Sequence, residues 1–158
     1  MSYSDLSEDD VKGAMECIMV IKEKRDGRIK GRAVADGRKQ ERTMSTHSPT
    51  VSIEGLSISL TIDAKEERHV AVCDIVGAYL NADMEDKVIM IFRGNMADYM
   101  IQINPKRYAK SVHVQPDGTK VLYVRLRKAL YGCIQSALLW WRMLSTTLMD
   151  QGFKYIYI

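Results

Sequence analysis

One stretch, residues 70–81 (VAVCDIVGAYLN), constrains the fold of this chain most strongly. An apolar run leads into a single carboxylate, Asp74, and a small-residue turn at Gly77-Ala78 follows it. This pattern predicts a buried β-strand over residues 69–76, with Asp74 near its end. A buried carboxylate is costly unless it is paired or holds a metal, so Asp74 is the first candidate for chemistry. From the residues alone, a carboxylate that caps backbone amides at the strand end remains the alternative.

The bulk composition is that of an ordinary globular chain. Its 158 residues suffice for about one domain, with 46% hydrophobic and 27% charged residues. No apolar run approaches the roughly 20 residues of a membrane span, so no membrane partner is expected. The three cysteines are widely spaced and form no paired metal-binding pattern, which predicts a reducing, intracellular compartment.

The charges are distributed unevenly. Residues 22–42 hold nine Lys and Arg against four Asp and Glu. Residues 51–100 hold four against nine, and residues 101–158 hold nine against two. Two basic segments therefore flank an acidic centre that contains Asp74. Solvated faces explain many such charge runs. The alternative is that the two basic segments bind a polyanion, with metal-binding carboxylates between them.

Turn signals and alternation predict most of the other elements. Asp26-Gly27 predicts the turn of a hairpin over residues 14–36, and Asp117-Gly118 predicts that of a second hairpin over residues 112–124. The further predictions are a disordered polar lead (1–12), a strand (87–92), a short helix (near 95–103) and a long helix (136–151) with Ser136 as its N-cap, Ala137, Trp141, Leu144 and Leu148 on its apolar face, and Gly152 as its stop. The apolar end of the chain, residues 153–158, predicts the start of another strand.

Residues 51–64 are ambiguous between strand and helix. Alternation with polar residues favours a strand, and it is carried by Leu56, Ile58, Leu60 and Ile62. A helical face with Ser52 as its N-cap also fits. The local pattern slightly favours the strand.

Five segments form one pattern when they are taken together, in this order and with these separations. They are IKGRAVADGRKQ (29–40), SPTVSIEGL (48–56), VAVCDIVGAYLNADM (70–84), LYVRLRKALYGCIQSALLWW (122–141) and QGF (151–153). Jointly they resemble the reverse transcriptase (RNA-directed DNA polymerase) of copia-type LTR retrotransposons. Each segment alone is weak, but five in order are specific.

The resemblance implies an α+β fold: the fingers and the first part of the palm of a right-hand polymerase. It implies a mixed antiparallel sheet with helices packed on one face, and a partial reverse transcriptase domain over residues 13–158. The 14–36 hairpin would belong to the fingers. Residues 52–64 would be a palm helix, against the local alternation, because tertiary context overrides strand propensity.

The resemblance also implies roles for single residues. Asp74 is expected to be the first catalytic aspartate, which binds Mg²⁺ (or Mn²⁺) together with the Ile75 carbonyl. Tyr79 is expected to be a steric gate that favours deoxynucleotides. The other implied nucleotide-binding residues are Lys30, Arg32, Gly132 and Gln135. From the residues alone, Lys30 and Arg32 lie on one face of a strand. There they form either a clamp for phosphates or the charged edge of a sheet.

The implied reaction is templated transfer of deoxynucleotides onto a primer by two metal ions. The implied partners are an RNA or DNA primer–template, dNTP and the rest of the retrotransposon polyprotein. The implied location is intracellular, in the cytoplasm, a virus-like particle or the nucleus. The family's Tyr-x-Asp-Asp motif follows the QGF segment, and the sequence ends at Ile158 before it. We therefore expect an incomplete metal site and no polymerisation by this chain alone. Two alternatives stay open: a non-catalytic nucleic-acid-binding remnant, and a functionless remnant that aggregates through an exposed sheet edge.

Overall fold

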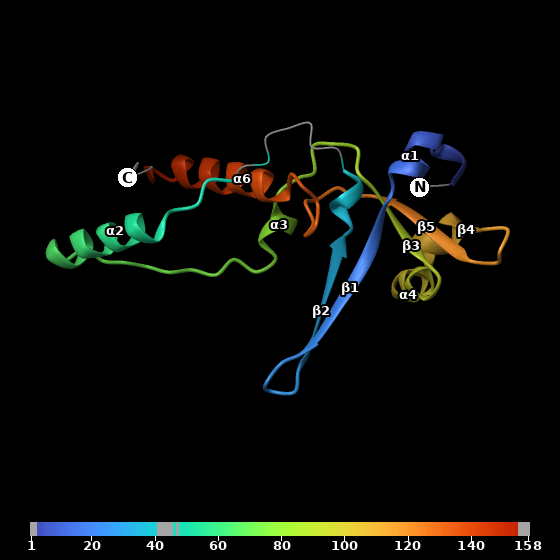
Figure 1. Cartoon of the computed structure of the whole chain (residues 1–158), viewed down its shortest axis with the longest axis horizontal. Helices are drawn as coiled ribbons and strands as arrows, with labels where there is room; N and C mark the ends of the chain where they lie inside the picture. The colour runs from blue at the N-terminus through green and yellow to red at the C-terminus, as the bar shows by residue number, and fades with distance from the viewer. Residues whose placement is uncertain (1–2, 41–45, 47, 155–158) are drawn as a thin grey trace.

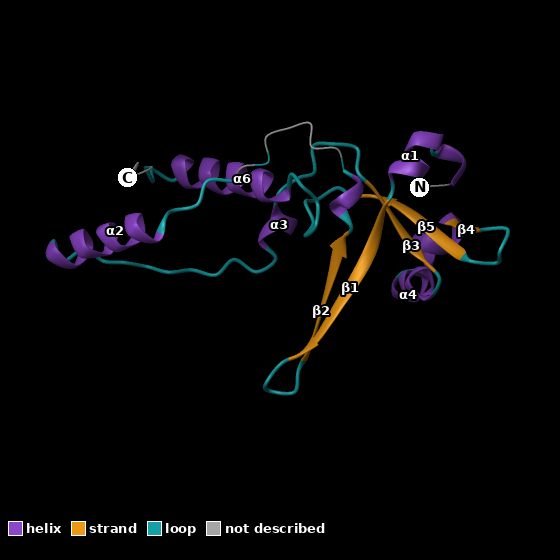
Figure 2. Ribbon diagram, viewed as in Figure 1, coloured by secondary structure: helices purple, strands orange, loops and turns teal. Residues whose placement is uncertain are grey.

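The computed structural model describes residues 3–40, 46 and 48–154. Its centre is a five-stranded sheet with the strand order β2-β1-β3-β5-β4 (Figures 1 and 2). The strands are β1 (Met15–Glu23), β2 (Ile29–Ala35), β3 (Ile89–Arg93), β4 (Val112–Val114) and β5 (Lys120–Arg125). Only the β1–β3 pair is parallel among these neighbours. The predicted α+β class with a mixed sheet is confirmed, and its division into fingers and palm stays a prediction.

Short helices surround the sheet or extend from it. In the described part of the chain the α-helices are α1 (Glu8–Gly13), α2 (Ile53–Lys65), α3 (Ala78–Asn81), α4 (Asn95–Ile103), α5 (Pro105–Tyr108) and α6 (Ser136–Asp150). Single 3-10 turns cover Tyr3–Asp5, Gly37–Lys39 and Ala109–Ser111. None of the helices in these described ranges is long and apolar enough to cross a membrane.

The sheet is buried on both faces at its centre. Along β3, Met90 and Phe92 belong to one apolar cluster, whereas Ile89 and Ile91 belong to the other. Helix α4 packs on the first cluster through Ala97, and α1 packs on the second. The prediction that the helices pack on one face is therefore wrong. The physical reason is that successive apolar residues of β3 point to opposite faces of the sheet, so helices must cover both faces.

The N-terminal residues differ from the predicted disordered lead. Tyr3–Asp5 form a 3-10 turn and Glu8–Gly13 form α1, and residues 1–2 lie outside the described chain. Ser7 and Asp10 form a reciprocal capping box at the start of α1, with hydrogen bonds of 3.1 and 3.0 Å. Lys87 then binds the Asp10 carboxylate at 2.6 Å. Val11 packs on the sheet beneath. Local capping and one long-range ion pair thus order a segment whose composition alone is polar.

The two predicted hairpins are confirmed with their turns. Gly27 and Gly118 adopt φ values of +78° and +82°, which glycine tolerates without strain. The hairpin of β1 and β2 is long and extends away from the rest of the sheet (Figure 1). Its outer half is exposed on both faces, including four consecutive apolar residues, Ile18, Met19, Val20 and Ile21.

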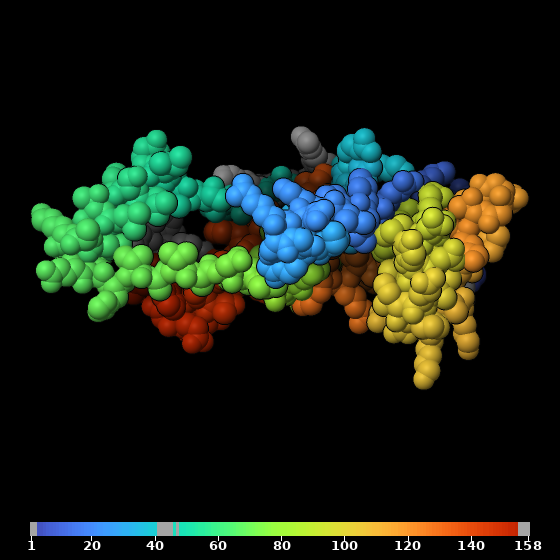
Figure 3. Space-filling model, turned by 90° about the horizontal axis from the view of Figure 1, so that it is seen from below, coloured from blue at the N-terminus to red at the C-terminus, as the bar shows by residue number. Residues whose placement is uncertain are grey.

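Residues 53–65 are helical, as the family resemblance implies and against the local alternation. Ser52 caps α2, since its hydroxyl accepts a hydrogen bond of 3.0 Å from the Gly55 amide. Only Gly55 of α2 is buried. The helix therefore does not cover the sheet, and it extends toward the same end of the molecule as α6 (Figures 1 and 3).

Helix α6 begins and ends close to its predicted bounds, but not with the predicted N-cap. The Ser136 hydroxyl instead bonds the Leu130 backbone, to the carbonyl at 2.7 Å and from the amide at 3.1 Å. Gly152 stops the helix as predicted, with φ +89° and its amide bound to the Met149 carbonyl at 2.9 Å. The predicted apolar face is only partly covered, since Ala137, Trp141 and Leu144 are half-buried and Leu148 is exposed. The buried leucine of the helix is Leu139, which lies outside the predicted face.

The predicted buried strand at residues 69–76 is wrong. This segment has no secondary structure up to Ile75 and runs in the open between α2 and α3 (Figure 1). Val72 and Val76 are 95% and 89% exposed. The physical reason is that no strand in the described ranges pairs with the segment, so nothing covers its apolar run. The last predicted strand falls mainly on residues 155–158, which lie outside the described residues.

Candidate functional site

The base of the long hairpin is joined to the segment that precedes α6, residues 129–135, which is called the connector below. The Ala35 amide donates a hydrogen bond of 2.8 Å to the Tyr131 carbonyl. Next to it, Gly132 has φ +94°, and a Cβ there would lie 1.9 Å from the Ala35 carbonyl oxygen. A Cβ on Gly37 would lie 2.0 Å from the Gly132 oxygen. The two backbones can approach this closely only because both positions are glycine. The family resemblance implies that Gly132 binds a nucleotide, which stays a prediction; the close approach that the structure shows is to the hairpin.

Gln135 lies at the same junction, and its side chain forms hydrogen bonds with three other side chains. Its side-chain amide donates to the Asp86 carboxylate at 3.2 Å and to the Met84 sulfur at 3.3 Å. Its carbonyl oxygen accepts a hydrogen bond of 3.0 Å from Gln40. The Gln40 oxygen in turn accepts one of 2.8 Å from the Ile134 amide. Gln40 therefore fixes Gln135 and its backbone, a role that we did not predict, although Gln40 ends the 29–40 motif.

Tyr79 lies beside this connector. Gly77, with φ +61°, turns the chain into α3, and α3 lies against α6. The half-buried Tyr79 ring packs on the ring of Tyr131, with centroids 4.6 Å apart and planes inclined by 42°. Tyr131 is a second contact that we did not predict. The pair brings the predicted gate next to the Gly132–Gln135 segment, while its selecting role stays a prediction.

The Asp36 carboxylate organises the first residues after β2. It accepts two hydrogen bonds from the Arg38 guanidinium, at 2.8 and 2.6 Å. The Asp36 amide binds the Glu16 carbonyl at 2.9 Å, which ties the turn to β1. The Arg38 hydrogen bonds lower the pKa of Asp36 to about 2.

We expect the Asp36→Asn variant to lose less stability on acidification than the wild-type chain. The folded-state pKa lies below that of an unfolded Asp, near 3.9. The carboxylate therefore stabilises the fold above about pH 4, and this contribution disappears as the pH falls toward 2. Urea unfolding midpoints between pH 6 and pH 2 measure the effect. A wild-type-to-variant difference that stays constant over this range would contradict it.

Asp74 and Ile75 lie in the exposed segment before α3. Within residues 3–40, 46 and 48–154, no hydrogen bond or ion pair reaches the Asp74 side chain. No group of three His, Cys, Asp or Glu that could hold a metal ion occurs among the described residues. One carboxylate and one carbonyl do not make a site for two divalent cations. The described residues therefore do not fit the complete metal centre, and the assignment of Asp74 and Ile75 stays a prediction.

Lys30 and Arg32 occupy one face of β2, opposite Lys22 and Val20 of β1. Both side chains are exposed. In the part of the chain that the structure describes, no hydrogen bond or ion pair joins them to the other predicted residues. The structure thus brings Tyr79, Gly132 and Gln135 into one region, and it leaves Asp74, Lys30 and Arg32 outside that network.

The sequence of the chain matches a known protein family over nearly the whole length of the chain. The family is described as "Reverse transcriptase (RNA-dependent DNA polymerase)", and its match covers residues 14–158. The chain belongs to this family. The match includes the hairpin, the Asp74 segment, the connector and α6, so the predicted resemblance is confirmed.

Relatives in baker's yeast place the chain among reverse transcriptases of copia-type retrotransposons. The "Transposon Ty1-BL Gag-Pol polyprotein" of Saccharomyces cerevisiae is 28% identical over 94% of the chain and 8% of that protein. The "Truncated transposon Ty1-A Gag-Pol polyprotein" is 29% identical over 94% of the chain and 11% of that protein. The chain thus spans about a tenth of these relatives or less. No solved structure matches the chain.

Proposed function

We propose that the chain supplies the nucleotide- and template-binding part of a copia-type reverse transcriptase. The complete enzyme would transfer deoxynucleotides onto a primer along an RNA or DNA template. The junction of hairpin and connector carries this proposal, because Gln40 and Gln135 join two sequence motifs 95 residues apart at 3.0 Å. Both motifs belong to the family pattern, and Tyr79 lies beside them through Tyr131.

Each predicted residue has a role in this proposal. Tyr79 selects deoxynucleotides by its ring, Gln135 lines the nucleotide pocket, and Lys30 and Arg32 bind the triphosphate. Asp74 and the Ile75 carbonyl offer two oxygen ligands for Mg²⁺ or Mn²⁺. The remaining ligands of a two-metal centre must come from outside the described residues, so no catalytic step is assigned to these residues alone. The proposed setting is intracellular, within a retrotransposon polyprotein.

We expect no templated DNA synthesis by the isolated chain in a primer-extension assay with Mg²⁺ or Mn²⁺. The reason is that the described residues around Asp74 supply one carboxylate, and the two-metal reaction needs more. A complete copia-type reverse transcriptase on the same primer–template is the positive control. Templated incorporation by the isolated chain that disappears in Asp74→Asn would contradict the expectation.

The alternative function is nucleic-acid binding without catalysis. Its supporting observation is that Lys30 and Arg32 are exposed and make no ion pair with described residues, so they are free to meet phosphates. Fluorescence anisotropy of a labelled primer–template measures this binding. Affinity that falls steeply with salt supports a binder. Absence of binding even at low salt would contradict both the alternative and the proposed template-binding role.

A further inference from the structure

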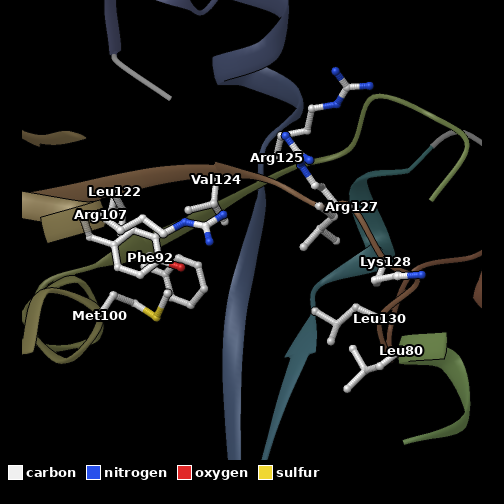
Figure 4. Close-up of a pocket in the computed structure, with 12 residues that line it drawn as sticks. Leu80, Phe92, Met100, Arg107, Leu122, Val124, Arg125, Arg127, Lys128 and Leu130 are labelled. Atoms are coloured by element: carbon white, nitrogen blue, oxygen red, sulfur yellow. The ribbon is translucent and has the colours of Figure 1, made fainter. Parts of the chain in front are cut away.

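The outer half of the β1–β2 hairpin has an open edge. Strand β1 lies beside β3 only at Met15 and Glu16, and beyond Glu16 no strand in the described ranges pairs with this edge. In Figure 4 the blue ribbon of β1 runs down apart from Phe92 of β3 and Met100 of α4. The β1 edge is therefore open along residues 17–23.

Alternation along β1 decides which backbone groups face this open edge. The Lys24 amide donates a hydrogen bond of 2.8 Å to the Arg28 carbonyl, and the Glu16 carbonyl accepts one of 2.9 Å from the residue that follows β2. In an antiparallel pair every second residue bonds the partner strand, so the even-numbered residues of β1 bond β2. The amides and carbonyls of Met19 and Ile21 face outward, and no other described residue bonds them. They are free to bond another strand.

The two long edges of the hairpin differ in charge. Along the β1 edge, five consecutive uncharged residues, Cys17–Ile21, precede Lys22 and Glu23. The β2 edge carries Lys30 and Arg32, which form no ion pair with described residues. Two β2 edges paired antiparallel would set cation against cation, which destabilises a ladder. The β1 edge is therefore the one that suits a further strand.

We propose that the β1 edge pairs with the β1 edge of a second copy of this chain, antiparallel and about a two-fold axis at Val20. Each copy uses the same edge, so the assembly closes at a dimer. In this register Met19 of each copy exchanges hydrogen bonds with Ile21 of the other, and the two Val20 side chains are direct neighbours. Strand β1 of the second copy ends one residue short of Glu16, where β3 already lies.

Charges of opposite sign meet at both ends of this pairing. The residue after β1 is Lys24, which the register places opposite Glu16 of the other copy, and the two-fold axis repeats this pair. The Glu16 side chain is 51% exposed and already attracts one cation, Arg93 at 3.2 Å. Lys22 lies opposite Ile18, and its aliphatic stem can cover that side chain. A second copy thus satisfies the backbone groups and the charges together, which favours it over an unrelated strand.

The first test is cross-linking at the two-fold axis. The two Val20 residues form a non-hydrogen-bonded pair with Cα atoms about 4.5 Å apart, a separation that a disulfide can span. In a Cys17→Ala/Cys73→Ala background, which removes the half-buried and the exposed thiol, we expect Val20→Cys to form a cross-linked dimer in a glutathione buffer. Non-reducing electrophoresis measures it.

The matched control for cross-linking is Ile18→Cys in the same background. Ile18 is almost as exposed as Val20, at 45% against 49%, so random collisions would cross-link both variants alike. In the proposed register the two Ile18 positions are four residues apart along the ladder, about 14 Å, which a disulfide cannot span. We expect little cross-linking of this variant.

The second test is sedimentation equilibrium of the whole chain. We expect a monomer–dimer equilibrium with a Kd on the order of 10 μM, because a single strand pair is smaller than the interfaces of stable complexes. Val20→Lys should weaken it at least about tenfold, since two ammonium groups would lie directly opposite each other. The control is Val114→Lys on β4, which is also exposed, at 56%, and lies away from this edge. Circular dichroism shows whether the variants fold.

Three results would overturn the inference. One is a chain that stays monomeric at every concentration, and another is equal cross-linking of Val20→Cys and Ile18→Cys. The third is association that Val20→Lys leaves unchanged, including growth beyond a dimer, which would indicate unspecific aggregation. The inference goes beyond the proposed function, and neither test contains nucleic acid. A failure to bind primer–template would therefore not affect these results, and the two failures are distinguishable.

Discussion

The Gly132→Ala variant is expected to lose at least about 3 kcal/mol of unfolding free energy. Two costs combine at this position. A residue other than glycine at φ +94° is strained by about 1–3 kcal/mol. The new methyl group would also lie 1.9 Å from the Ala35 carbonyl oxygen and 2.9 Å from a Val34 methyl. Because the Ala35 carbonyl oxygen belongs to the backbone, the clash can be relieved only if the hairpin and the connector separate. The hydrogen bond from the Ala35 amide to the Tyr131 carbonyl would then break.

The Gly118→Ala variant is the matched control. Gly118 has a similar φ of +82°, but a Cβ at this position would have nothing within 4 Å, so only the strain remains. We expect a loss of about 1 kcal/mol there. Urea unfolding followed by circular dichroism measures both variants. Equal destabilisation by the two substitutions would show that the close approach at Gly132 does not hold the hairpin to the connector.

The same glycine shows what the sequence predicts and what it does not. The family resemblance implies that Gly132 lies at the nucleotide pocket, and a glycine permits a close approach of the backbone. It does not reveal the neighbour, since Ala35 is almost a hundred residues away and its position depends on the register of β1 and β2. Local signals such as Asp26-Gly27, Asp117-Gly118 and Gly152 were predicted correctly, because turns and helix ends depend on nearby residues.

Features that need a partner element were predicted poorly. The apolar run before Asp74 has the composition of a buried strand, yet a strand requires a neighbour to accept its hydrogen bonds, and none in the described ranges does so. The segment that carries Asp74 is exposed for this reason. The capping role of Ser136 failed similarly, because its hydroxyl found the Leu130 backbone six residues earlier. Gln40 and Tyr131 were missed because their partners, Gln135 and Tyr79, are distant in the sequence.

The large exposed area of the molecule has the same cause, because several segments have no partner element to cover them. The chain exposes 12056 Å², whereas a compact monomer of 18.0 kDa exposes about 8000 Å². Much of the difference lies in the outer half of the hairpin, in α2 and in the segment before α3. Apolar side chains in these places are covered by no other described element. Stability should therefore be divided unequally between the sheet and α2.

We expect the backbone amides of α2 to exchange with deuterium at least about a hundredfold faster than those of β3 and β5. Helix α2 has 13 residues and only Gly55 is buried, while its Ile and Leu side chains are 41–81% exposed. An isolated helix of this length is marginal in water, so its amides open locally at little cost. The central strands are buried on both faces, and their amides should open only on global unfolding.

Helix α4 is the internal control for this measurement. It is shorter, with nine residues, but it packs Ala97 fully against the sheet, with Met96 and Met100 beside it. If helix length decided protection, α4 would exchange faster than α2. If burial decides it, α2 exchanges faster, and this is the result that we expect from hydrogen-exchange mass spectrometry. Equal protection of α2 and α4 at a dilution where the chain is monomeric would contradict it. The exchange pattern would then require a cover for α2 that the described residues do not provide.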